Sequence, residues 1–130
     1  MMNTNEFLSR YAAGQRDFSE IKLMAANLSR IDLSHVNLSN ADLRGAKLIS
    51  TNLTKANLSH VNLSGAKLSG ARLSGANLTG ANLSEASLIK ANLTKANLTM
   101  TNLTKADLSD VNVNDAYLIG AIMPDGTKHE

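Results

Sequence analysis

The sequence predicts an all-β solenoid, on three observations that agree with one another. Leucine occupies every fifth position from Leu23 to Leu118, with Val113 as the one substitute. A small residue, usually alanine, stands two positions before each leucine, with an outward polar residue usually between them. Most leucines are followed by serine or threonine and then by a residue that suits a turn. These features predict a chain of short, repeated β-segments joined by turns.

The period of five residues decides between the regular structures. On an α-helix, leucines with this spacing would turn by about 140° from one to the next and line no single face. On a long strand, the odd spacing would send alternate leucines to opposite faces. The even frame also lacks the paired leucines of a leucine-rich repeat. A chain that turns a corner after every five residues instead brings each leucine to one central axis.

The N-terminal segment is expected to form a short helix over residues 4–13. Asn3 or Asn5 can cap its start, and Gly14 can end it. Its apolar side is formed by Phe7, Leu8, Tyr11 and Ala12. An open coil would expose its hydrogen-bonding edge and its core. We therefore expect this helix to cap the N-terminal end of the solenoid.

The repeat unit is illustrated by residues 76–80, Ala-Asn-Leu-Thr-Gly. The alanine and the leucine point inward and the asparagine outward, as in a short strand. The last two residues form the corner. Glycine at this corner supplies the positive φ of a type II turn, at Gly45, Gly65, Gly70, Gly75, Gly80 and Gly120.

This motif resembles that of the pentapeptide-repeat family over about four fifths of the chain. The leader in residues 10–18 and the ending in residues 122–127 resemble those of cyanobacterial members. The resemblance implies a right-handed quadrilateral β-helix of about five coils, with four units in each coil. The expected organisation is a capping segment over residues 1–17, the β-helix over 18–123 and a tail over 124–130.

Four units per coil imply that residues twenty apart stack in columns. Phe18 is then expected above Leu38. One inner column contains only alanine, at Ala26, Ala46, Ala66, Ala86 and Ala106. One outer column contains Asn37, Asn57, Asn77 and Asn97 and ends in Tyr117. Because asparagine ladders can hydrogen-bond along a stack, we expect such a structural ladder here.

The C-terminal end is apolar at Ile119, Ile122 and Met123, and residues 124–126 (Pro-Asp-Gly) indicate a turn that ends the coil. We expect either a folded-back tail or a dimer through this end, so the protein is a monomer or a dimer.

The sequence offers little for catalysis, because leucine and alanine fill the interior. The three histidines are separated surface residues, at His35, His60 and His129. The acidic group near the C-terminus lacks the spacing of a calcium loop, at Asp107, Asp110 and Asp115. Cysteine is absent. We expect no enzyme activity, no cofactor and no metal.

Charge is distributed unevenly along the chain. Between residues 44 and 105 there are eight basic residues and a single acidic one, Glu85. These basic residues are the candidate interaction surface: Arg44, Lys47, Lys55, Lys67, Arg72, Lys90, Lys95 and Lys105. The alternative is that they keep a repetitive rod soluble and prevent edge pairing.

We therefore expect a structural or interaction scaffold of unknown biochemical role, with an unidentified protein partner. Some members of the family imitate duplex DNA and bind DNA gyrase, and this is the alternative. The basic middle of the chain argues against it, because a DNA mimic presents a dense acidic surface. No specific nucleic-acid binding is expected, because aromatic stacking residues are scarce. The start has no signal-peptide pattern, and no apolar run could cross a bilayer, so we expect a cytoplasmic protein with no membrane partner.

Overall fold

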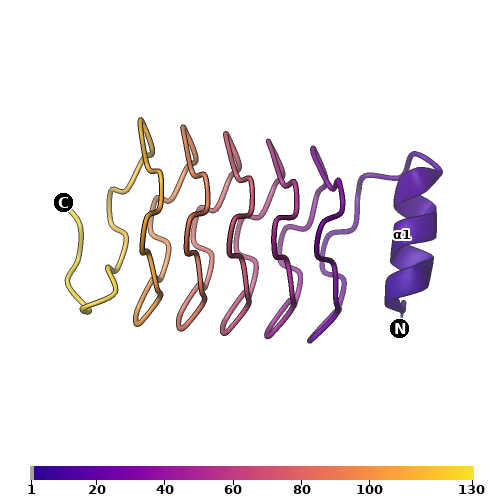
Figure 1. Ribbon diagram of the computed structural model, residues 1–130, viewed down its shortest axis with the longest axis horizontal. Coiled ribbons are helices and arrows are strands. Elements are labelled where there is room, and N and C mark those ends of the chain that lie inside the picture. Colours follow the sequence, from indigo (N-terminus) through magenta and orange to yellow (C-terminus); the bar gives the residue numbers. More distant parts are fainter. Residues whose placement is uncertain (1) are drawn as a thin grey trace.

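The computed structural model describes residues 2–130, in which helix α1 (Thr4–Ala12) is followed by a stack of coils (Figure 1). Parallel bridges join residues twenty apart, from the Asp17–Asn37 pair to the Asn102–Ile122 pair. Within residues 2–130 these are single bridges rather than extended strands, because each side of a coil ends at a corner. The twenty-residue register implied by the family resemblance is therefore the observed one.

Hydrogen bonds run along the stack in a regular pattern. The N–H of Leu58 donates to the carbonyl of Asn77 at 2.7 Å, and the N–H of Asn77 donates back to the carbonyl of Ala56 at 2.9 Å. Each coil is thus held to the next on every side by the backbone itself. This pairing leaves the side chains free to vary on the outer surface.

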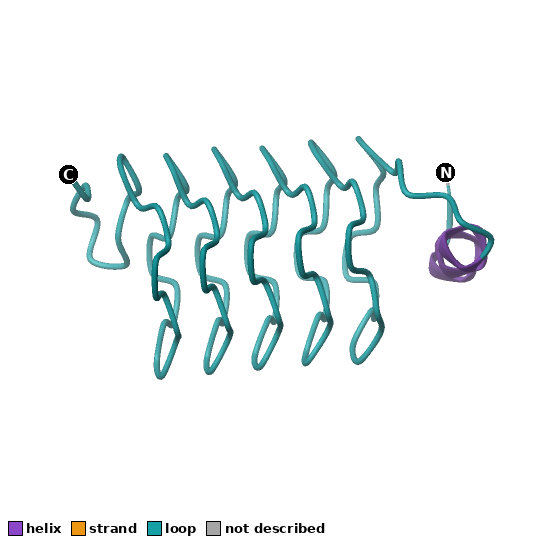
Figure 2. Ribbon diagram, turned by 90° about the horizontal axis from the view of Figure 1, so that it is seen from above, coloured by secondary structure: helices purple, strands orange, loops and turns teal. Residues whose placement is uncertain are grey.

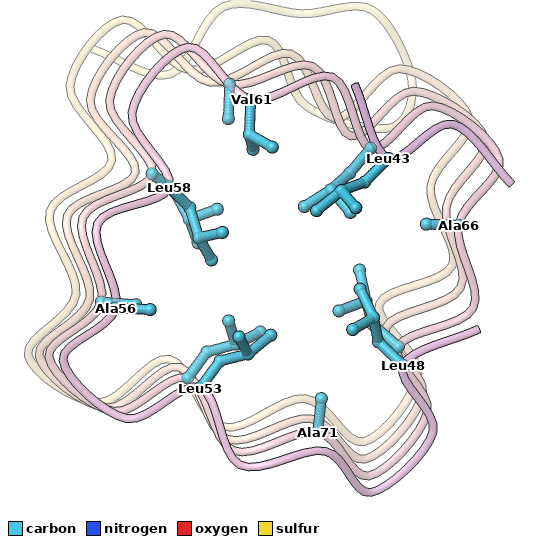
Figure 3. Close-up of a cluster of buried hydrophobic side chains, with 14 of the residues drawn as sticks. Leu43, Leu48, Leu53, Ala56, Leu58, Val61, Ala66 and Ala71 are labelled. Atoms are coloured by element: carbon cyan, nitrogen blue, oxygen red, sulfur yellow. The ribbon is translucent and has the colours of Figure 1, made fainter. Parts of the chain in front are cut away.

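The interior is filled by the inward positions that the sequence predicted. Figure 3 shows Leu43, Leu48, Leu53 and Leu58 pointing to the centre from four corners, with smaller side chains along the sides between them. These leucines are fully buried. Each contributes about 1.5–3 kcal/mol by its removal from water. The stabilising burial is therefore distributed over the successive coils of the rod.

Two threonines replace alanine at inward positions and are fully buried. The Thr51 hydroxyl donates to the carbonyl of Leu28, and the Thr101 hydroxyl to the carbonyl of Leu78, both at 2.7 Å. Throughout residues 2–130, no buried side-chain nitrogen or oxygen lacks a partner. Threonine is tolerated in this slot because its hydroxyl reaches the carbonyl of the preceding coil.

The corners are type II turns. At a typical corner the N–H of Ala76 donates to the carbonyl of Leu73 at 3.0 Å, and Gly75 between them has φ +66°. Positive φ recurs at every fifth residue from Glu20 to Gly120, although most of these residues are not glycine. A side chain in this conformation costs about 1 kcal/mol or more. Regular stacking therefore holds the backbone in this conformation even where the local sequence disfavours it.

The prediction that the asparagine side chains hydrogen-bond along the stack is wrong for most of this column. In that column the one hydrogen bond between side chains of successive coils in the described residues runs from Asn37 Nδ2 to Asp17 Oδ1, at 3.3 Å. Elsewhere the asparagine oxygen accepts within its own coil. Asn77 Oδ1, for example, accepts from the N–H of Thr79 at 3.0 Å and from its hydroxyl at 2.7 Å. This Asx turn satisfies the corner N–H that the ladder leaves unpaired.

Helix α1 lies across the N-terminal end of the stack (Figures 1 and 2). Its N-cap is Asn3, whose side chain accepts from the N–H of Glu6 at 2.8 Å. Phe7 is fully buried and meets the ring of Phe18 edge-on, with ring centres 4.6 Å apart. The Tyr11 hydroxyl donates to the carbonyl of Ser34 at 2.8 Å. These contacts bind the helix to the first coil.

Two details of the expected helix are corrected by the structure. The helix ends at Ala12, and Ala13 is its C-cap. Ala12 is exposed, whereas Met2 packs partly buried against the core. The helix therefore covers the coil with large side chains, which bury more apolar surface than an alanine methyl.

The C-terminal tail folds back on the last coil. After the turn, the N–H of Met123 donates to the carbonyl of Thr127 at 2.7 Å, and Ile122 and Lys128 form an antiparallel bridge. The N–H of His129 donates to the carbonyl of Ala121 at 2.7 Å. Of the two expected arrangements, the structure therefore contains the folded-back tail.

Candidate interaction surface

The outer surface is built from three positions of each unit, namely the residue between alanine and leucine and the two corner residues. Residues twenty apart in the sequence form columns along the rod because successive coils stack in register. All eight candidate basic side chains lie exposed on this surface. Their arrangement is therefore decided by their position within the twenty-residue coil.

Only one pair of the candidate residues occupies adjacent positions in the same column. Lys47 and Lys67 are bridge partners on adjacent coils of the same side. Lys55 and Lys95 share a corner column but are separated by Gly75, two coils apart overall. Arg72 lies on another side, bridged to Asn52 and Asn92. The basic residues consequently lie in several columns, on two neighbouring sides of the rod and at the three corners beside them.

Arg44 is already engaged by a neighbouring carboxylate. Its Nη2 lies 2.6 Å from Asp42 Oδ2, and its Nε donates to Asp42 Oδ1 at 2.9 Å. The hydrogen bond from Arg44 lowers the pKa of Asp42 below its ordinary value. A partner that bound Arg44 would first have to displace this ion pair.

Three further lysines lie one coil before an aspartate in the same corner column. The N–H groups of these lysines donate at 2.9 Å to the carbonyls of the residues that directly precede the aspartates. The pairs are Lys90 with Asp110, Lys95 with Asp115, and Lys105 with Asp125. The alternation of sign is favourable by a few tenths of a kcal/mol at most, because these side chains are exposed. This alternation is visible in the sequence only when charges twenty residues apart are compared.

Half of the candidate basic residues therefore have an acidic neighbour, which weakens the positive electrostatic potential around them. Among the described residues, contact ion pairs are confined to Glu6–Arg10 and Asp42–Arg44. Lys47, Lys55, Lys67 and Arg72 have no acidic residue one coil away in their own columns, although Arg72 lines a hollow together with Asp32. Of these, the Lys47–Lys67 pair is the most concentrated positive charge on the rod.

Several carboxylates act in turns. The N–H of Ser19 bonded to Asp17, and that of Ser34 bonded to Asp32, hold the pKa of each aspartate below its ordinary value. The hydroxyl of Ser109 has the same effect on the pKa of Asp107. Hydrogen bonding of this kind favours the charged form. These groups are stabilised as carboxylates and are poorly suited to donate a proton near neutral pH.

Three shallow hollows stand out on the described part of the surface. One of about 280 Å³ lies between α1 and the first coil, around Met2 and Leu23. Another of about 410 Å³ lies beside the tail, around Met100 and Ile119. The third, of about 290 Å³, is lined by polar residues that include Arg30, Asp32 and Arg72.

The histidines do not converge with other ligating groups. His35, His60 and His129 are all exposed. Residues 2–130 contain no group of three histidine, cysteine, aspartate or glutamate side chains that could hold a metal ion. In the same residues, no helix is long and apolar enough to traverse a lipid bilayer.

A dry core of stacked leucines inside parallel coils of five-residue sides defines a β-solenoid repeat protein. The family model for pentapeptide repeats matches this chain in eight copies, over residues 26–65, 56–94, 66–104 and 86–123. The chain belongs to the pentapeptide-repeat family, as its repeat motif indicated. Members of this family fold as right-handed quadrilateral β-helices, which is the predicted fold class.

Solved structures of cyanobacterial members are similar to this chain. Rfr23 from Cyanothece 51142 is 32% identical with a TM-score of 0.68, and the match covers 84% of this chain and 91% of Rfr23. The protein alr5209 from Nostoc PCC 7120 is 34% identical with a TM-score of 0.50, covering 85% and 95% of the two chains. The resemblance to cyanobacterial members is thereby confirmed. Among curated proteins there is no significant match.

The plasmid-mediated fluoroquinolone resistance protein QnrB1 also matches, at 21% identity and a TM-score of 0.29, over 82% of this chain and 62% of QnrB1. At this level the match carries no argument about function.

Proposed function

We propose that this protein is a non-enzymatic scaffold that binds another protein through the outer surface of its β-helix. In this proposal, five coils closed at one end by α1 form a rigid rod in the cytoplasm, which presents fixed columns of polar side chains. The carrying observation is the complete burial of the inward side chains in the central coils, such as Leu78 and Ala81. Because the centre of these coils is occupied, recognition along the length of the rod has only the outer surface available.

A repeated backbone makes such a surface well suited to recognition. Adjacent coils place side chains about 4.8 Å apart in straight columns. The ladder and the Asx turns fix the backbone beneath these side chains. Binding a partner would therefore cost the rod little conformational entropy. The most concentrated charge in these columns is the Lys47–Lys67 pair. We propose this pair as the centre of the surface that meets an acidic region of the partner.

Inhibition or protection of DNA gyrase is the less favoured function. Of the acidic side chains that a duplex mimic requires, the stretch between residues 44 and 105 contains one, Glu85. Such a mimic would need a dense negative surface to compete with DNA.

Affinity capture from the native cells tests the scaffold proposal. The bait would be the whole chain, compared with Lys47→Glu/Lys67→Glu and with the matched control Lys55→Glu/Arg72→Glu, which changes the net charge equally. We expect a reproducible protein partner whose recovery falls with the first variant and is retained with the second. Equal losses in both variants would show that only overall charge matters. Absence of any reproducible partner, together with measured turnover of a substrate, would contradict the scaffold role.

A further inference from the structure

We infer that the C-terminal end of the rod is a docking edge for an extended, basic segment of a partner protein. The inference rests on the proposed scaffold function and adds a second surface to it, with a partner of defined chemistry. It starts from the difference between the two ends of the same solenoid. The N-terminal end is covered by α1 and the buried ring of Phe7, whereas the C-terminal end has only the tail (Figure 1).

The last coil presents an unpaired hydrogen-bonding edge. One coil earlier, the N–H of Leu98 donates to the carbonyl of Tyr117, and the carbonyl of Ala96 accepts from the N–H of Tyr117. In the described chain, the equivalent N–H groups of Leu108, Val113 and Leu118 make no hydrogen bond. The carbonyls of Ala106, Val111 and Ala116 likewise accept none. Three of the four sides are therefore open to a further strand.

The tail occupies only the fourth side. It pairs there through the Ile122–Lys128 bridge and through the bonds between His129 and residues 120 and 121. The tail therefore leaves the edge of residues 106–118 unpaired.

Apolar side chains are exposed beside this unpaired edge. Val113 occupies an inward position but is 37% exposed, whereas Leu93 in the same column one coil earlier is 1% exposed. Leu108 and Leu118 are partly exposed as well. At the rim, Tyr117 and Ile119 are 61% and 68% exposed. A strand added here would cover aliphatic groups that the rest of the rod buries.

The charge at this end favours a basic occupant over a second copy of the chain. Residues 106–130 contain five acidic residues and one lysine, Lys128. Two such ends facing each other would bring like charges together, which is destabilising. The columns of Asp110 and Asp115 each contain a lysine one coil below, Lys90 and Lys95. A lysine or arginine of a partner strand, placed over each aspartate, would continue this alternation of positive and negative charge along the column.

The geometry specifies the pattern of the segment. Over Asp115, Ala116 and Leu118, a partner strand would place a basic residue, a small residue and an aliphatic residue at the corresponding positions. Its residue opposite Tyr117 would donate to the carbonyl of Ala116 and accept from the N–H of Leu118. These are the bonds that Tyr117 makes to the carbonyl of Ala96 and the N–H of Leu98 one coil earlier.

A synthetic peptide tests this inference directly. The probe is Lys-Ala-Asn-Leu-Thr-Lys-Ala-Asn-Leu-Thr, the sequence of residues 90–99, and the matched probe has glutamate in place of both lysines. In NMR titrations of the whole chain at low salt, we expect the amide signals of Val113 and Leu118 to shift. We expect the lysine probe to bind about tenfold more tightly, as two exposed charge pairs would provide. The Asp110→Asn/Asp115→Asn variant, whose asparagines suit positive φ, should lose this preference with an unchanged circular dichroism spectrum.

Three outcomes would overturn the docking edge. These are no shift at Val113 and Leu118, equal binding of both probes, and sedimentation that shows a dimer of the chain with those amides already protected. Affinity capture separates this inference from the scaffold function. A partner captured equally by the wild-type chain and by Asp110→Asn/Asp115→Asn, together with a negative titration, would remove the edge and leave the scaffold. Probe binding with no captured partner would support the edge and count against the scaffold.

Discussion

Replacement of Leu78 by alanine tests the central premise that the leucine frame forms the core. Leu78 is fully buried, and its column neighbours one coil away, Leu58 and Leu98, are fully buried too. A coil cannot collapse inward without breaking its ladder to both neighbours, so the cavity should persist. Truncation of a leucine in such a site costs about 2–5 kcal/mol. We expect the upper half of this range.

Val113→Ala provides the matched comparison in the same kind of slot. Val113 is 37% exposed because no further coil covers it. Removal of its two methyl groups should cost about 1 kcal/mol, because each contributes about 0.8 kcal/mol when fully buried and these two are only partly buried. His35→Ala, on the exposed surface, should change stability by less than about 0.5 kcal/mol. Leu78→Lys should break the middle of the rod, because it buries a charge that has no partner.

Urea unfolding followed by circular dichroism measures these differences through the shift of the midpoint at constant slope. The expected order of destabilisation is Leu78→Ala, then Val113→Ala, then His35→Ala, with at least about 2 kcal/mol between the first two. If Leu78→Ala and Val113→Ala cost the same, the burial gradient along the rod is wrong. If Leu78→Ala and His35→Ala melt alike, the assignment of inward positions is wrong.

Three further predictions concern the corners. Gly80→Ala should destabilise the rod more than Gly65→Ala. A Cβ at position 80 would lie 2.5 Å from His60 Nδ1, whereas a Cβ at position 65 has no atom within 4 Å. In a double-mutant cycle of unfolding free energies, His60→Ala should remove the additional cost of Gly80→Ala. Asn77→Ala should cost about 1 kcal/mol by thermal unfolding, through loss of its Asx turn, and Asn77→Asp should retain most of the stability. The pKa of Asp107 is lowered from its ordinary value of 3.8. Its contribution to the free energy of unfolding is therefore present above that pH and is lost as the pH falls through the lower pKa of the folded state. Asp107→Ala should flatten the acid limb of the curve of stability against pH, and an unchanged limb would contradict this role of Asp107.

The predictable part of this protein is the part that depends on neighbours within five residues. The inward leucines, the outward asparagines and the corners all follow from the spacing, because an unbroken frame allows one solution for every unit. The helix cap, expected at Asn3 or Asn5 and found at Asn3, and the burial of Phe18 at the start of the core depend on similarly local chemistry. Each required only the chemistry of the residue and its place in the unit.

The family resemblance implied the columns of residues twenty apart, but the hydrogen bonds and the charge environment within those columns were decided by the tertiary structure. The asparagine oxygens had two possible donors, and the close corner N–H took precedence over the neighbouring coil because the ladder spacing leaves that N–H unpaired. The candidate basic band was predicted as eight residues, but the stacking separates it into different columns and places acids beside half of it. Neither result could be read from composition.

The five-residue frame in the sequence determined which side chains face the axis, and turn chemistry determined where the chain bends. Only the tertiary structure decided which groups bond within the columns, which donors the asparagine oxygens take and which sides of the last coil stay unpaired. The physical reason is the range of the interactions: burial and turns are set within one unit, whereas ladders, charge columns and the uncovered edge exist only after distant units meet.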